Sequence, residues 1–143
     1  MNWLTTALFT IVFYSTFDLF VKLASGKIND NLGAAIMNIT SFIVAVGWFL
    51  IRAQFGGETA SVTRLGLTYS ILAGIFVGLA SIFFIRMFAL GTNLSIGIPL
   101  VRVGMVVVGS LLGILILKEG FNVRYLLGFL LSALGLYLVM TAK

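Results

Sequence analysis

The stretch Ile71–Ile85, ILAGIFVGLASIFFI, decides the fold of this chain, because it contains no charge and a single hydroxyl, that of Ser81. A strand of a membrane barrel alternates apolar and polar residues over roughly ten positions. Here the sequence is apolar on all sides, and Val106–Leu117, VVVGSLLGILIL, has the same character. Lipid offers the backbone no hydrogen-bond partner, so only helices and closed barrels cross a membrane. Both stretches therefore predict membrane-spanning helices.

The composition of the whole chain agrees with this interpretation. Hydrophobic residues make up 61% and charged residues 9%, whereas a soluble domain is about half apolar and a quarter charged. A helix needs about 20 apolar residues to cross the hydrocarbon layer. Five runs have this character: Trp3–Leu23, Leu32–Ile51, Leu65–Leu90, Leu94–Leu117 and Tyr125–Met140. The sequence predicts an all-α integral membrane protein with five transmembrane helices in a single domain, residues 1–143.

The connections between the runs are too short to hold a soluble domain, and no long segment is repeated within the chain. The first run has no basic segment before it and no small-residue cleavage site after it, which argues against a removable signal peptide. We expect this first helix to remain in the mature protein.

The absence of Cys and His removes thiol nucleophiles, imidazole bases and the usual soft-metal ligands. We expect no enzymatic activity, no cofactor and no metal site. The net charge of +5 is spread without a run of like charge, which makes nucleic acid a poor candidate partner. The expected surroundings are the lipid bilayer.

Lys and Arg near the span ends set the orientation of a membrane protein. Four of these cations lie on the side of the N-terminus: Arg52, Arg64, Lys118 and Arg124. The other side has Lys27, Lys143 and, if its side chain reaches the surface, Lys22. This difference favours an N-terminus in the cytoplasm. We expect the protein to lie in the cytoplasmic membrane of a prokaryote. The margin is small enough that insertion in both orientations stays open.

Four charged residues fall within the predicted spans: Asp18, Lys22, Arg86 and Arg102. A charge at the bilayer centre costs about 2.5 to 3.5 kcal/mol on insertion scales, so each needs a compensating interaction. The first and third spans end, and the fourth begins, on the same side of the membrane. At 1.5 Å per residue, Asp18 lies roughly 8 to 10 Å and Arg102 roughly 12 Å from that surface. We expect these two side chains to be able to meet.

Two interpretations of these charges stay open. In a functional site, Asp18 binds a proton or a cationic group, while Arg102, with Lys22 or Arg86, holds an anionic group. In a structural arrangement, Asp18 pairs with Arg102 or, at i,i+4, with Lys22, and the Lys22 and Arg86 side chains extend to the interface. Asp18 and Arg102 lie deeper in the membrane, which favours a functional role for these two residues. The structural interpretation suits Lys22 and Arg86 better.

Neutral residues add three expectations. Pro99 lies one turn before Arg102 and frees the carbonyl of Ser95, which predicts a kinked helix along a solute pathway, with an ordinary packing kink as the alternative. Tyr14, one turn before Asp18, extends the candidate cavity wall. Asn38 on the second span could bind solute or serve helix packing, the more usual role.

Pairs of small residues at i,i+4 occur in three spans, where they allow close approach of helix backbones. They are Gly74 with Gly78, Gly109 with Gly113, and Gly128 with Ser132. These pairs predict helix packing within the chain or an interface with a second subunit.

The C-terminal half carries a family resemblance. A polar turn ALGTNLS (89–95) precedes the proline-containing helix IGIPLVRVGMVVVGSLLGILIL (96–117). The connector KEGFNVRY (118–125) with Glu119 and the closing helix LLGFLLSALGLYLV (126–139) follow. This order resembles the second half of an EamA domain, the repeat unit of the drug/metabolite transporter superfamily, and the five-span count matches one such unit.

Larger members of that superfamily carry two inverted units in tandem, so the resemblance implies that this chain works as a homodimer, in a parallel or an antiparallel arrangement. Small multidrug resistance proteins, which are more distant, also carry a membrane acid in their first helix. Asp18 resembles that acid in location only, because Lys22 and Arg102 depart from the pattern. Glu119 is the family-like acid, and we expect it to tie the turn between the last two helices.

We therefore expect a subunit of a secondary transporter that moves a small organic metabolite, preferably anionic or zwitterionic, by alternating access. The alternative is a non-transporting membrane scaffold, or a half-transporter that pairs with a second five-helix chain. A channel is the third option.

Overall fold

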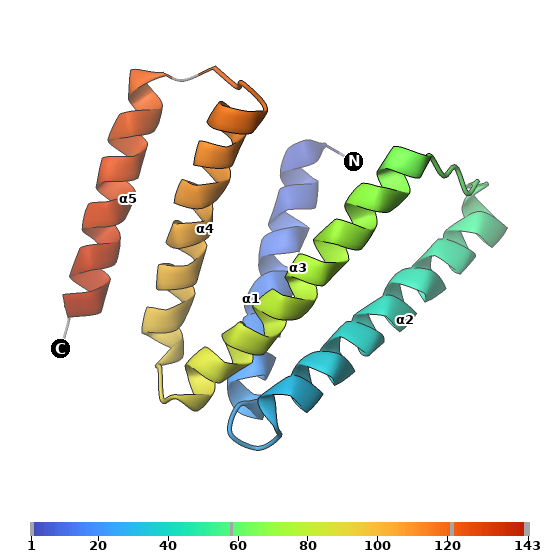
Figure 1. Cartoon of the computed structure of the whole chain (residues 1–143), viewed down its shortest axis with the longest axis horizontal. Coiled ribbons are helices and arrows are strands. Elements are labelled where there is room, and N and C mark those ends of the chain that lie inside the picture. Colours follow the sequence, from blue (N-terminus) through green and yellow to red (C-terminus); the bar gives the residue numbers. More distant parts are fainter. Residues whose placement is uncertain (1, 58, 121, 142–143) are drawn as a thin grey trace. The chain divides into compact units, whose positions relative to one another are not determined.

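The computed structural model describes residues 2–57, 59–120 and 122–141, and every described element is a helix. The helices, labelled in Figure 1, are α1 (Trp3–Ala24), α2 (Asp30–Gly56), α3 (Arg64–Ala89), α4 (Leu94–Ile116) and α5 (Val123–Thr141). Each is long and apolar enough to cross a membrane. The predicted all-α fold with five apolar helices is confirmed.

The predicted bounds are close except at α2, which starts before Leu32 and continues past Ile51. At its start, the side chain of Asn29 accepts hydrogen bonds from the backbone N–H groups of Asn31 and Leu32 at 3.1 and 3.3 Å. Such a cap satisfies N–H groups that lack a partner within the helix. At its end, Gly57 adopts the left-handed conformation with φ 65°, which glycine tolerates without steric cost. These polar end turns lie outside the apolar run Leu32–Ile51, so the apolar pattern did not predict them.

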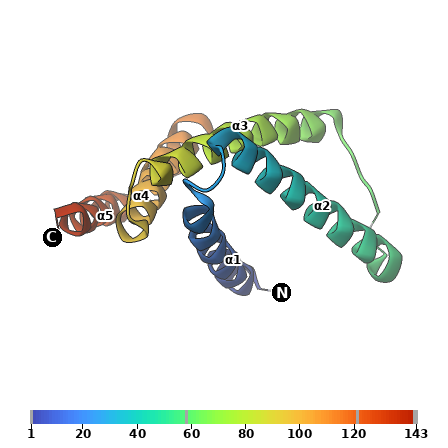
Figure 2. The same ribbon diagram turned by 90° about the horizontal axis from the view of Figure 1, so that it is seen from below.

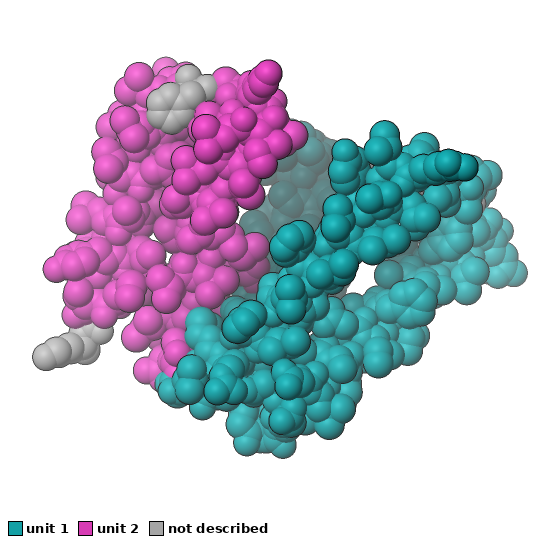
Figure 3. Space-filling model, in the orientation of Figure 1, with its two compact units in different colours: residues 1–91 teal, residues 92–143 magenta. Residues whose placement is uncertain are grey.

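The chain divides into two compact units, residues 1–91 with α1, α2 and α3 and residues 92–143 with α4 and α5 (Figure 3). The boundary falls at the turn near Gly91, whose φ of 98° suits glycine.

The three helices of the first unit meet at one end and diverge toward the other (Figures 1 and 2). The C-terminal ends of α1 and α3 and the N-terminal end of α2 come together there. The buried apolar side chains all belong to this end: Val21, Ala34, Ile85 and Phe88. A Cβ on Gly33 would lie 3.1 Å from Ile28 Cγ2 and 3.2 Å from Ile85 Cδ1, so the absence of a side chain at Gly33 allows this close approach.

In the second unit, α4 and α5 run antiparallel and are joined by a short connector that folds back on α4 (Figure 1). Lys118 adopts φ 54° just past the end of α4, and the N–H of Glu119 donates to the carbonyl of Gly113 at 3.2 Å. Glu119 Oε2 lies 2.6 Å from the point where a Cβ on Gly113 would stand. Glu119 thus contacts α4 where Gly113 lacks a side chain, which supports the expected turn-tying role.

Candidate functional site

A groove of about 300 Å³ lies between the three helices of the first unit. Two of the predicted site residues, Tyr14 and Asn38, line it together. The full lining is Phe13, Tyr14 and Phe17 from α1, Met37, Asn38 and Ser41 from α2, and Val77 and Ser81 from α3. On each helix these residues lie next to the buried end, on the side toward which the helices diverge. The groove therefore begins where the close packing stops.

Asn38 links α2 to α3 in the wall of this groove. Its Nδ2 group donates to the backbone carbonyl of Ala34 at 2.7 Å and to Ser81 Oγ at 2.8 Å. The Ser81 hydroxyl donates within its own helix, to the carbonyls of Val77 and Gly78, each at 2.9 Å. Ser81 can therefore accept from Asn38 without leaving its own proton unpaired. This bond connects residues 43 positions apart and joins α2 to α3.

The amide oxygen of Asn38 is left available to a ligand. Both N–H bonds of the amide are used, while Oδ1 accepts no hydrogen bond from the described residues. Among the described residues, no buried side-chain nitrogen or oxygen lacks a hydrogen-bond partner, so this oxygen must be accessible. An amide oxygen is an acceptor, and here it suits a hydroxyl, amine or ammonium donor.

A series of aromatic rings runs from the groove into the buried end. The ring centroids of Tyr14 and Phe17 are 6.2 Å apart, edge to face, and those of Phe17 and Phe84 are 6.3 Å apart and nearly parallel. Phe84 then meets Phe88 at 5.2 Å. These separations fall in the favourable range for aromatic pairs. The rings form an apolar wall that connects α1 with α3.

Asp18 lies in the buried end and does not line the groove; only 3% of its surface is exposed. It shares a face of α1 with Tyr14 and Lys22, one turn away on either side. The Lys22 ammonium sits 5.4 Å from the centroid of the Phe88 ring, within the range of a cation–π interaction. The acid and this lysine are thus part of the closed end, beside the groove.

Arg86 pairs with an acid that the sequence analysis did not single out. Its Nη1 lies 3.5 Å from Asp30 Oδ2, and the two side chains are 64% and 20% exposed. The bond joins the end of α3 to the start of α2. Asp30 offsets the charge of Arg86, and this arrangement fits the structural interpretation of Arg86. In the first unit, Lys22 and Arg86 are then balanced by Asp18 and Asp30.

Arg102 and Pro99 belong to α4, in the other compact unit. The predicted meeting of Asp18 with Arg102 stays a prediction. The helix α4 continues through Pro99 from Leu94 to Ile116, and the pathway-lining role of this proline stays a prediction as well.

The small-residue pairs have different surroundings. Gly74 and Gly78 line a hollow of about 430 Å³ on the α2–α3 surface, together with Ala34 and Asn38. Cβ atoms added at Gly74, Gly78, Gly109 or Gly128 would meet nothing within 4 Å among the described residues. These positions have room for a partner, and their role in helix packing or dimerisation stays a prediction.

Two contributors to the site were missed from the sequence, Ser81 and Asp30. Ser81 is the only hydroxyl in Ile71–Ile85, which is a usable signal, although its partner on α2 lies too far away in sequence to be inferred. Asp30 lies before the apolar run Leu32–Ile51, so the apolar pattern does not place it on a helix.

The chain was compared with known protein families, characterised proteins and solved structures. No protein-family description, no characterised protein and no solved structure matches the chain.

Proposed function

We propose that this chain is a subunit of a secondary transporter that moves a small organic metabolite by alternating access. The observation that supports this proposal is the groove of the first unit, which lies beside the buried side chains at the end where the three helices meet. Away from that end the helices diverge (Figure 2). A site reached from one side and blocked on the other is one state of an alternating-access cycle.

In this proposal the closed end acts as the gate. Opening it would separate Phe88 from the Phe84 ring and from Lys22, and would break the Arg86–Asp30 bond between α3 and α2. Asp18 lies inside this gate. Protonation of Asp18, or its binding of a cationic group, would change the charge balance there, and we propose this change as the coupling event.

The solute contacts proposed for the first unit are neutral. The groove offers the Asn38 oxygen, the hydroxyls of Ser41 and Ser81 and an aromatic wall. Three of the four charged residues predicted within the spans are cations, which favours an anionic or zwitterionic solute. Asp30 offsets the charge of Arg86, so this preference now rests on Arg102 in α4. We retain it as a proposal, together with an antiparallel homodimer that would provide a second, inverted groove.

Solute binding can be tested first and transport second. Purified protein is screened by thermal shift against amino acids and carboxylic acids, since a ligand that binds only the folded state raises its apparent stability. Solutes that give a shift are then tested for uptake into proteoliposomes, with and without a proton gradient.

The variant Asn38→Leu removes the open acceptor, and we expect it to reduce uptake by up to about tenfold, since a hydrogen bond contributes about 0.5 to 1.5 kcal/mol net. Ser70→Ala on α3 is the control, since Ser70 is exposed and outside the groove. Equal uptake by Asn38→Leu and the control would show that the groove is not the solute site. If none of the tested solutes is taken up and the protein co-purifies with a second five-helix chain, the scaffold or half-transporter alternative holds.

A further inference from the structure

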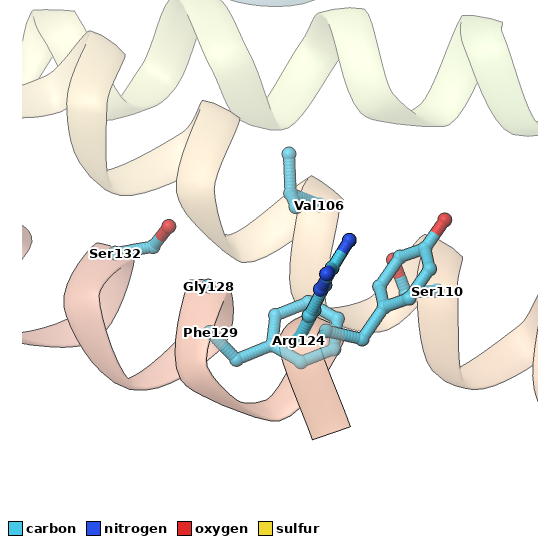
Figure 4. A pocket seen from close by; sticks show the side chains of 7 residues that line it. Val106, Ser110, Arg124, Gly128, Phe129 and Ser132 are labelled. Atoms are coloured by element: carbon cyan, nitrogen blue, oxygen red, sulfur yellow. The ribbon is translucent and has the colours of Figure 1, made fainter. Parts of the chain in front are cut away.

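The second unit has a groove of its own, which the proposed transport mechanism does not use. It lies between α4 and α5, has a volume of about 370 Å³, and is lined as Figure 4 shows. The lining residues are Val106 and Ser110 from α4 and Arg124, Tyr125, Gly128, Phe129 and Ser132 from α5. Its size falls within the range of small-molecule sites.

One end of this groove is cationic. The Arg124 side chain extends from α5 toward Val106 on α4 (Figure 4). Within residues 2–57, 59–120 and 122–141, its guanidinium makes no ion pair and no hydrogen bond. The neighbouring charges on the connector are Lys118 and Glu119, and the Glu119 carboxylate lies against Gly113. Arg124 is the one charged residue among those that line the groove, so this end of it carries a positive charge.

The rest of the groove is suited to an apolar chain. Val106 and Phe129 provide apolar contacts, and a Cβ at Gly128 would meet nothing within 4 Å. From Arg124 to Ser132 the groove follows α5 for about 12 Å at 1.5 Å per residue. The hydroxyls of Ser110 and Ser132 also line it. A ligand with an anion at one end and an apolar segment of about this length would match both parts of the groove.

We propose that the α4–α5 groove binds an anionic phospholipid, with its phosphate at Arg124 and Tyr125 and an acyl chain along Phe129 and Gly128. Arginine forms bidentate hydrogen bonds with phosphate oxygens. Tyr125 and Arg124 are residues of the first turn of a membrane-spanning helix, the depth at which lipid headgroups lie. A free phosphate would use the cationic end alone, and a second copy of the chain would not need a cation there.

Lipid binding is measured by native mass spectrometry and by thermal shift in detergent. The probes are phosphatidylglycerol, phosphatidylcholine and, as the headgroup without chains, glycerol phosphate. We expect phosphatidylglycerol to bind and stabilise the protein, and the other two to have little effect at equal concentration. One basic residue near an anionic membrane surface corresponds to about a fivefold change in affinity, so Arg124→Gln should weaken phosphatidylglycerol binding about fivefold, while Arg124→Lys should retain part of it.

Arg64→Gln is the matched control. Arg64 is the first residue of α3, carries the same charge and is exposed. Its substitution should change phosphatidylglycerol affinity less than twofold. Gly128→Leu keeps every charge, improves helix propensity and fills the groove, so it should also weaken lipid binding.

Three results would overturn the proposal. Equal losses in Arg124→Gln and Arg64→Gln would mean that general charge attraction accounts for the binding. Glycerol phosphate that stabilises as well as the lipid would identify an anion site without a chain. Loss of the dimer in Gly128→Leu with unchanged lipid binding would assign the groove to a second subunit.

Discussion

Removal of the Asn38–Ser81 hydrogen bond is predicted to lower the free energy of unfolding by a measurable amount. The bond joins α2 and α3 at 2.8 Å, and hydrogen bonds between membrane helices contribute about 0.6 kcal/mol on average and up to about 1.7 kcal/mol. Ser81→Ala removes only the acceptor of this bond between helices, because the hydroxyl otherwise bonds within its own helix. Its cost should therefore fall in that range.

Asn38→Leu loses a second bond, to the carbonyl of Ala34 at 2.7 Å, so the single substitutions have different costs. A double-mutant cycle isolates the shared bond. We expect a coupling energy of about 1 kcal/mol, measured by reversible unfolding in mixed detergent micelles. Ser70→Ala, on the same helix and exposed, should couple to Asn38→Leu by less than about 0.3 kcal/mol, as expected for distant sites. A coupling for Ser81 as small as that of Ser70 would refute the assigned geometry.

Three further predictions follow from the same structure. Lys118→Gly should stabilise the protein by about 0.5 kcal/mol, because it relieves about 1 kcal/mol of left-handed strain at φ 54° and loses about 0.5 kcal/mol of favourable charge at a helix C-terminus. Lys27→Gly, where no positive φ is found, should give no such gain in the same thermal unfolding assay. Asp30→Asn should cost less than about 1 kcal/mol in unfolding titrations, since its partner Arg86 is 64% exposed; a larger loss would mean that the pair is shielded from solvent. A cysteine appended to the C-terminus should react with impermeant reagent from outside only, in line with the charge distribution; labelling from both sides would establish dual topology.

The apolar runs predicted the number and approximate extent of the helices, because hydrocarbon imposes both length and composition on a spanning helix. The apolar runs did not predict the ends of α2, which extends from Asp30 to Gly56. Asn29 caps the start of α2 with its side chain, and Gly57 ends the helix in the left-handed conformation. Both residues lie outside the apolar run Leu32–Ile51.

The site was predictable in part. Tyr14 was expected to extend a cavity wall, and it lines a groove together with Asn38. For Asn38 helix packing was the more usual role, and its bond to Ser81 on α3 fits that role. A contact of either residue with solute stays a prediction. The partner of Asn38 could not be inferred from the sequence. A hydrogen bond between two helices depends on which side of each helix faces the other, and an almost uniformly apolar stretch does not show this. The same holds for Asp30 and Arg86, whose contact depends on how α2 and α3 approach each other.

Because the helices of the first unit pack together at one end only, a small rotation at that end produces a large displacement at the other end. With 26 residues, α3 is about 39 Å long at 1.5 Å per residue. A rotation of about 10° around the buried cluster would displace its far end by about 7 Å on that length. Small changes in the packing of Asp18, Ile85 and Phe88 would thus become larger displacements at the far end of the helix, while the hydrogen bonds within each helix stay intact.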